Sequence, residues 1–336
     1  MSWGIKEHYY SGQGVVLVSR RGTDGKPTGF RPVGNVPDLK ITIGTSTLEH
    51  KESTTGQRGT DMRLTTETKC GLSFTMENFN AKNLADAMRG DSTLVPGAVI
   101  VGKALIAYIG LISALGRVGL SSIAVKQGAA VLTPYVDDST PWDYQVNELA
   151  GSVKFNDGAA LGFGALGEAI TAVAVGTSTT FSIANHTAKV GGNITVRGFT
   201  GANAAEVNGK TLMVTAIAAG TVSVALNSTA KVYTVGAATK AVYDGISLTA
   251  DYTFPDQYQV EALTQGATEL MMRFEGLNTA EENSPVVVEV FRFLTDPLKE
   301  LSLISDAVQQ FVLEGSVLAD TTRAIGSRYF NTQKLN

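Results

Sequence analysis

Glu49, His50 and Glu52 lie within four residues of one another, and carboxylate and imidazole groups are common ligands of divalent metal ions. The segment also has the pattern of an extended strand, in which successive side chains point to opposite faces. Glu49 and His50 would then face away from each other, so a solvated or interfacial charge pattern explains these residues better than a metal site. The other histidines, His8 and His186, have no metal-ligand spacing, and we expect no bound metal.

Two glycine motifs could in principle bind phosphate. GFGALG at Gly162–Gly167 matches G-x-G-x-x-G, but the residues that follow are β-branched and soon broken by Gly176. A dinucleotide site needs a helix there and an acidic residue about twenty positions on, and neither is indicated. GKT at Gly209–Thr211 has Ala204 where a phosphate loop needs glycine, and it leads into a strand. We interpret the two motifs as a flexible junction and a β-turn, and we expect no cofactor.

Cys70 is the one cysteine of the chain, so no intramolecular disulfide and no multi-cysteine zinc site can form. No G-x-S-x-G nucleophile motif is present, and Cys70 has no local nucleophile signature. A hydrolase that pairs Cys70 with a histidine through folding stays open as a rival hypothesis. Unchanged function after Cys70→Ser would remove it, and we expect a protein that is not an enzyme.

The composition favours many short strands and turns over long helices. Of the 336 residues, 43% are hydrophobic, 17% are charged and 36 are glycine, so the chain can bury a sizeable core. The formal charge of −4 and the isoelectric point near 5.5 give no global basic signal for nucleic-acid binding.

The most apolar run of the chain, Ala104–Gly116, has thirteen residues between Lys103 and Arg117 and is too short to span a membrane as a helix. The first residues, MSWGIKEHYYSGQG, lack the apolar core of a signal peptide. We therefore expect a protein that is soluble and intracellular when made, without membrane insertion.

The N-terminal part predicts strands and one helix. Val15–Val18 has the pattern of a buried strand, whereas Asp38–Gly44 and Cys70–Glu77 alternate apolar and polar residues as half-buried strands do. The helix is predicted over Asn78–Gly90, with Asn80 as its N-cap, Arg89 in its last turn and Gly90 closing it. The polar stretch Glu49–Gly71 therefore joins two strands.

Between residues 162 and 247 the composition changes. Three acidic and five basic side chains give this segment a net charge of +2, which leaves −6 for the remainder of the chain. Short Thr- and Val-rich strands recur between Gly and Asn turns, as in a small β-sandwich. We predict an inserted Ig-like β module at 162–247 between two parts of a main domain, at 1–161 and 248–336. A last strand at Gln310–Asp320 precedes a polar tail.

Both outer parts of the chain resemble the tail tube proteins of long-tailed bacteriophages. In the N-terminal part the resemblance rests on GNVPDLKITIG, EHKESTTGQRGTDMRL and FTMENFNAKNLADAMRG. In the C-terminal part it rests on RFEGLNTAEENSPVVVEVFRFLTDPLKELSLI and FVLEGSVLAD. It covers residues 10–155 and 246–322, and its specificity comes from the order and combination of motifs that individually indicate no catalysis.

The resemblance implies a mainly β fold, a β-sandwich or barrel with one flanking α-helix. It implies subunits that form hexameric rings and stack into the tail of a virion, assembled in the cytoplasm of the bacterial host. Tape measure protein, tail terminator and baseplate or distal tail proteins would be partners, and DNA would pass through the lumen without specific binding. An acidic remainder suits such a lumen, because neutralised phosphates would retain the genome.

The stretch Glu49–Gly71 then becomes a hairpin arm that orders against neighbouring subunits. Its charges balance, and complementary charge pairs select register and partner more than they raise affinity. We predict that Arg58, Asp61 and Arg63 contact an adjacent subunit or the next ring. The whole expected contact set is Glu49, His50, Lys51, Glu52, Arg58, Asp61 and Arg63. The alternative is a virion decoration or adhesion protein whose inserted module binds host-surface ligands.

Overall fold

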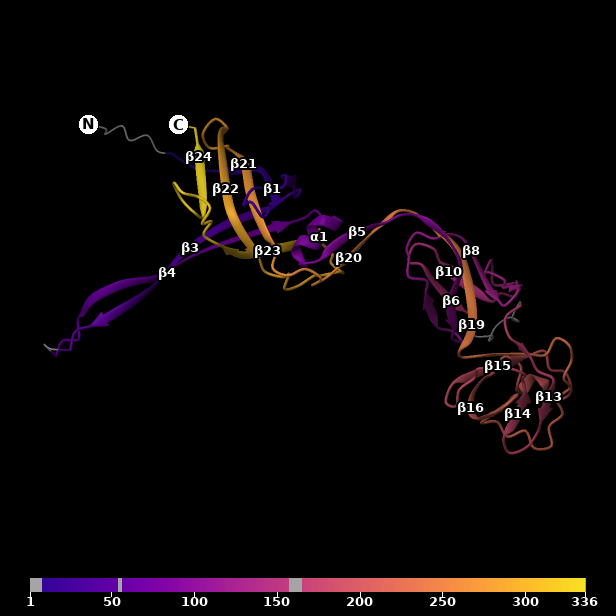
Figure 1. Ribbon diagram of the computed structural model, residues 1–336. Helices are drawn as coiled ribbons and strands as arrows, with labels where there is room; N and C mark the ends of the chain where they lie inside the picture. The colour runs from indigo at the N-terminus through magenta and orange to yellow at the C-terminus, as the bar shows by residue number, and fades with distance from the viewer. Residues whose placement is uncertain (1–7, 54–55, 157–164, 336) are drawn as a thin grey trace. The chain divides into compact units, whose positions relative to one another are not determined.

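The computed structural model describes residues 8–53, 56–156 and 165–335. Within them it has 24 β-strands, one α-helix and one short 3-10 helix, so the prediction of a mainly β fold with a single flanking helix is confirmed. The chain divides into two compact units. Unit 1 comprises Met1–Leu94 and Tyr258–Asn336, and unit 2 comprises Val95–Gln257 (Figure 1).

Unit 1 is built on one eight-stranded sheet with the order β2-β1-β21-β22-β23-β4-β3, in which β24 also pairs with β22. All its pairings are antiparallel. Its strands are β1 (Gly12–Arg20), β2 (Arg31–Pro32), β3 (Asp38–Lys51), β4 (Thr60–Met76), β21 (Glu269–Asn278), β22 (Ser284–Thr295), β23 (Phe311–Val317) and β24 (Phe330–Lys334). The chain leaves and returns to this unit through β5 (Asp91–Val95) and β20 (Gln257–Glu261), which pair with each other.

The core of unit 1 lies on one face of the sheet, the face to which every second residue at the end of β4 points. Leu72, Phe74 and Met76 are each at most 2% exposed, and Leu39 and Ile41 of β3 pack beside them. The register pairs Leu39 with Phe74 and Ile41 with Leu72, so the apolar residues of the two strands share one face. The alternation of apolar and polar residues in the sequence therefore predicted correctly which side chains of these two strands face the core.

Helix α1 (Ala81–Ala87) begins where its cap predicts. The Asn80 side chain accepts a hydrogen bond of 2.9 Å from the backbone N–H of Asn83, as an N-cap does. The other end differs from the prediction, because Arg89, not Gly90, adopts the left-handed conformation, with φ of 47°. Arg89 is held there by its guanidinium, which donates to the carbonyl of Thr295.

Gly90 has a different role from the one predicted. A Cβ atom at this position would lie 1.9 Å from the carbonyl oxygen of Glu261 in β20. The position therefore needs glycine because two backbone segments approach closely, and not because the helix ends there.

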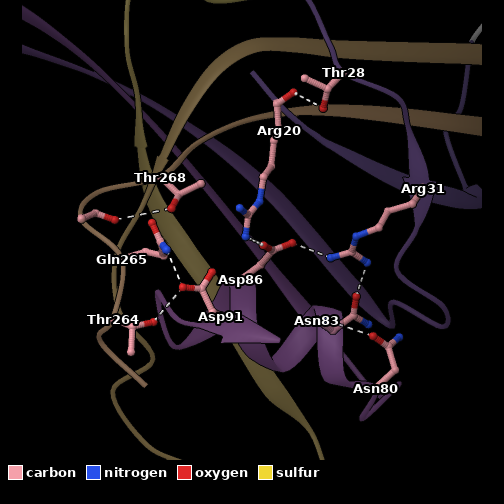
Figure 2. A network of polar contacts seen from close by, with 11 residues as sticks. Arg20, Thr28, Arg31, Asn80, Asn83, Asp86, Asp91, Thr264, Gln265 and Thr268 are labelled. Atoms are coloured by element: carbon pink, nitrogen blue, oxygen red, sulfur yellow. Dashed lines mark hydrogen bonds and ion pairs between the residues drawn. The ribbon is translucent and has the colours of Figure 1, made fainter. Parts of the chain in front are cut away.

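A network of hydrogen bonds and ion pairs connects α1 to strands β1 and β2 (Figure 2). The carboxylate of Asp86 accepts hydrogen bonds from Arg31 and Arg20, and Arg31 also donates to the amide oxygen of the fully buried Asn83. Asn83 in turn donates to the carbonyl of Val33. These bonds satisfy polar groups that burial would otherwise leave without partners.

A second buried network joins the two ends of unit 1. The guanidinium of Arg21, after β1, lies 2.8 Å from the carboxylate of Asp320, which is 3% exposed, and 3.5 Å from Glu269 in β21. Arg292 of β22 donates to Glu269 as well. Beyond Asp320 the sequence predicted a polar tail, but β24 forms there and pairs with Val286–Val290 of β22. The tail forms a strand because β22 leaves a backbone edge unpaired beside it.

This network predicts an acid-dependent loss of stability in unit 1. The hydrogen bond from Arg292 lowers the pKa of Glu269. Burial alone would raise the pKa of Asp320, but hydrogen bonds from Thr322 and the charge of Arg21 lower it overall. A carboxyl whose folded pKa is depressed stabilises the fold above its unfolded pKa, roughly 4 for these groups, and loses that contribution as the pH falls through the folded value.

We therefore expect Asp320→Asn to reduce the free energy of unfolding by about 2 kcal/mol at pH 7, where a charge-assisted hydrogen bond is lost. Urea titrations of the wild type and the variant between pH 7 and pH 3 check this, and the difference between them should shrink towards pH 3. A difference that stayed constant over this range would contradict the role assigned to the carboxylate.

Unit 2 contains three antiparallel sheets around one apolar core. The four-stranded sheet has the order β6-β19-β8-β9, the three-stranded sheet β10-β11-β7, and the seven-stranded sheet β12-β18-β15-β16-β17-β14-β13. The strands are β6 (Ala98–Ala107), β7 (Ile112–Ala114), β8 (Ser121–Gln127), β9 (Ala130–Val131), β10 (Tyr144–Asn147), β11 (Ser152–Phe155), β12 (Glu168–Ala169), β13 (Ala172–Ala174), β14 (Thr179–Ser182), β15 (Asn193–Arg197), β16 (Thr211–Ala218), β17 (Thr221–Val224), β18 (Lys240–Tyr243) and β19 (Ile246–Phe254), with the 3-10 helix η1 at Ala204–Glu206.

The compact unit 2 is larger than the predicted insertion of residues 162–247. The seven-stranded sheet lies within the predicted range, but residues 95–156 and 248–257, assigned from the sequence to the main domain, fold together with it. The physical reason is β19, which pairs with β6 on one side and β8 on the other. The predicted starting residue, 162, lies outside the described residues.

Candidate interface: the β3–β4 hairpin arm

Beyond the sheet of unit 1, β3 and β4 continue as a two-stranded hairpin. β4 pairs with β23 only from Gly71 to Met76, so residues 44–51 and 60–69 pair only with each other. We call these two segments the arm. Figure 1 shows β3 and β4 running side by side past the ends of the other strands. None of the described side chains of the arm is buried, so all of them are accessible at the surface of the subunit.

The arm has a defined register with two irregularities. A bulge between Ser46 and Thr47 leaves Thr66 without an opposite residue, and the Thr66 hydroxyl donates to the carbonyl of Ser46 at 3.0 Å. A second irregularity falls between His50 and Lys51. Bulges increase the local twist and re-aim side chains, so they set which residues face each side of the arm.

The structure pairs several of the predicted contact residues within the arm. Glu49 lies opposite Arg63, with 3.8 Å between carboxylate and guanidinium, and the Nδ1 atom of His50 lies 2.6 Å from a carboxylate oxygen of Asp61. Lys51 is exposed opposite Thr60. Exposed pairs of this kind contribute little stability, roughly 0–1 kcal/mol, which leaves their charges available to a partner.

The remaining predicted residues lie near the turn. The backbone N–H of Glu52 donates to the carbonyl of Gly59 at 2.9 Å and continues the ladder by one bond. Arg58 has φ of 51°, a conformation that costs energy in a residue with a side chain. Contact of any of the seven residues with a second subunit stays a prediction.

Sequence reasoning missed an apolar face on the arm. Leu48 lies directly opposite Leu64, and Met62 lies opposite His50, two residues further along. Leu48, Leu64 and Met62 therefore share one face, and each is more than half exposed, at 57%, 54% and 52%. The signal was present in the spacing, because Leu48 precedes His50 by two residues and Met62 precedes Leu64 by two.

The same sheet has a free edge along β3. Among the described residues this strand of fourteen residues pairs with β4 alone, so its second edge exposes a row of backbone donors and acceptors. At the other end of the sheet, β2 covers only Leu17 and Val18 of β1. Long open edges invite pairing with another chain, and proteins that stay monomeric shield them.

The residues considered for chemistry show other environments. Cys70 is buried opposite Ile43, and burial raises the pKa of its thiol, which disfavours the thiolate that a nucleophile needs. Among the described residues no group of three or more His, Cys, Asp or Glu side chains is arranged to hold a metal ion. In the same part of the chain no helix has the length and apolar character to cross a membrane.

The two glycine motifs lie at strand starts. Gly162–Gly164 lie outside the described residues, and Ala165–Gly167 lead directly into β12, where a dinucleotide site would need a helix. Gly209 has φ of 72°, and Thr211 begins β16. The second motif is therefore a turn before a strand, as its sequence predicted.

The fold and the arm define a class: a mainly β protein with an open-edged sheet, an exposed hairpin and a second β unit carried between two strands. A family model described as "Protein of unknown function UCP028589" matches residues 9–180 and 169–333. The chain belongs to this family, since the match covers nearly its whole length. No curated protein matches the chain.

Proposed function

We propose that this protein is the structural subunit of a phage tail tube, a homo-oligomer of stacked six-membered rings around a channel for DNA. The observation that carries the proposal is the open edge of β3, which runs from the sheet of unit 1 into the exposed arm. A closed ring gives such an edge a partner in the next subunit, and a stack of rings gives the arm one too.

The charge of unit 1 agrees with a passive conduit. It contains 18 basic and 21 acidic side chains, a net charge of −3. A protein that must let DNA pass cannot neutralise many phosphates, because each neutralised phosphate adds affinity.

Negative-stain microscopy of the purified protein tests the proposal directly. Hollow tubes or closed rings are the expected result at high protein concentration, with tape measure and baseplate proteins added as initiators if the protein alone stays small. A variant that lacks Val95–Gln257, with Leu94 joined to Tyr258 by a short glycine linker, should still form them. Monomers under every condition would contradict the proposal.

Charge reversal on the arm gives a quantitative prediction. Arg58→Glu with Arg63→Glu should weaken assembly about tenfold, because complementary charge pairs across an interface become repulsive. Sedimentation at several protein concentrations measures this, and added salt should weaken wild-type assembly as well. Lys26→Glu with Lys82→Glu makes the same change in net charge on exposed residues outside both β3 and the arm and is the matched control. Equal assembly by both variants would leave the arm as a solvated loop.

A further inference from the structure

The apolar residues of the β3–β4 hairpin change faces along its length. In the sheet, Leu39 and Ile41 of β3 lie on the core face, opposite Phe74 and Leu72. Strand alternation continues this core face into the arm through Thr45, Thr47 and Glu49. Leu48 lies on the other face, at an even-numbered position of β3, together with its neighbour Leu64. By alternation along β3, the apolar side chains of the arm therefore belong to the other face of the hairpin from Leu39 and Ile41.

A groove of about 330 Å³ lies beside β23 in the same unit. Apolar and polar side chains both line it, and Val312 is 41% exposed. The lining residues are Pro297, Leu298, Lys299, Glu300, Ser302, Gln310, Phe311, Val312 and Glu314. The loop that follows Ser302 presents Leu303, Ile304 and Val308 to solvent, with Ile304 95% exposed. Together the groove and the loop form a second surface with exposed apolar side chains, and no described residue of unit 1 covers it.

The arm and the groove lie at opposite ends of one ladder. β23 runs antiparallel to β4, with Ser316 opposite Gly71 at the root of the arm and Phe311 opposite Met76 beside the groove. Five residues of extended strand separate these ends by roughly 17 Å. The arm extends away from its own groove and cannot fill it, whereas a second copy displaced along the strand direction can.

The charges of the two surfaces are complementary. The segment beside the groove carries Glu300 and Asp306, and its one lysine, Lys299, is already paired with Glu314 of β23. The turn end of the hairpin, residues 51–59, carries Lys51, Glu52 and Arg58 and so has a net charge of +1. A heterologous contact between two different surfaces of one chain repeats without limit, which is what a stack of rings requires.

We infer that the arm of one copy seats Leu48, Met62 and Leu64 in the groove between Pro297–Ser302 and β23 of another copy. The inference rests on the proposed function and names the partner surface of the same arm. The loop at Leu303, Ile304 and Val308 covers the inserted side chains, so the two apolar surfaces are buried together.

Disulfide cross-linking tests the contact. The variant Leu64→Cys with Val312→Cys should give a ladder of multimers on non-reducing gels after mild oxidation. Arg63→Cys with Val312→Cys is the matched control, because Arg63 lies on the opposite face of the arm, and it should give at least tenfold less cross-linked product. Wild-type protein should give none, since its one cysteine, Cys70, is buried.

Four results would overturn the inference. Dimers formed by Leu64→Cys alone would show that arms pair with arms. A ladder of equal strength from the Arg63→Cys control would show that the contact has no preferred face. Tubes or rings seen by microscopy without a ladder from the Leu64→Cys and Val312→Cys variant would overturn the inference and leave the proposed function standing, whereas monomers at all concentrations would overturn both.

Discussion

Replacing Leu48 and Leu64 together by aspartate should abolish assembly while the subunit stays folded. Burying a leucine side chain stabilises a contact by about 1.5–3 kcal/mol, so the loss of two costs roughly 3–6 kcal/mol per arm before the penalty for burying carboxylates is added. That corresponds to a fall of about 10² to 10⁴ in the association constant of each arm. The monomer should be little affected, because both side chains are more than half exposed.

The opposite face of the arm supplies the control. Thr47 lies opposite Thr65 as Leu48 lies opposite Leu64, so Thr47→Asp with Thr65→Asp introduces the same two charges across the same ladder. Like charges placed opposite each other strain both variants equally, which leaves the face as the difference between them. Assembly is measured by sedimentation and microscopy, and folding by circular dichroism. Similar assembly by the two variants would contradict a role for the apolar face.

The second large effect is expected in unit 2, from Asp143→Ala. Asp143 is fully buried, and its carboxylate accepts three backbone hydrogen bonds, from Thr133 at 2.7 Å, Ala165 at 2.8 Å and Leu166 at 3.1 Å. It joins the loop before β10 to the segment that leads into the seven-stranded sheet. Alanine would leave three N–H groups without this acceptor, that of Leu166 buried and those of Thr133 and Ala165 part-buried, at about 1–3 kcal/mol each. We therefore expect a loss of roughly 3–5 kcal/mol in the free energy of unfolding.

Tryptophan fluorescence during urea denaturation measures this loss, because Trp142 is adjacent to Asp143. Asp137→Ala is the matched control: Asp137 is exposed and accepts hydrogen bonds from Ser139 and Thr140 in its own turn. That variant should lose no more than about 1 kcal/mol. A loss of the same small size for Asp143→Ala would mean that water or a rearranged loop satisfies the three donors.

The two effects would separate the roles of the two units. The arm variants should change assembly without changing stability, and Asp143→Ala should change the stability of unit 2 with tubes still formed by unit 1.

The sequence by itself determined the local features. Period-two alternation predicted the strands at Asp38–Gly44 and Cys70–Glu77, the side chain of Asn80 predicted the start of α1, and the polar stretch between the two strands predicted a hairpin. Each of these depends on residues a few positions apart, where side-chain periodicity and capping hydrogen bonds act, and so each can be read from a short window.

Only the tertiary structure decided the features that depend on distant partners. Strand β19 pairs with β6, about 140 residues earlier in the chain, and this pairing places β6 in unit 2. The unit therefore begins well before residue 162, where the change in composition had placed the start of the inserted module. The polar tail forms β24 because it pairs with the backbone edge of β22. Position 90 requires glycine because the backbone carbonyl of Glu261 leaves no room for a Cβ atom. The apolar face of the arm could be read from spacing, but its reversal relative to the core required the register of β3 against β4, which fixes the face that each side chain occupies.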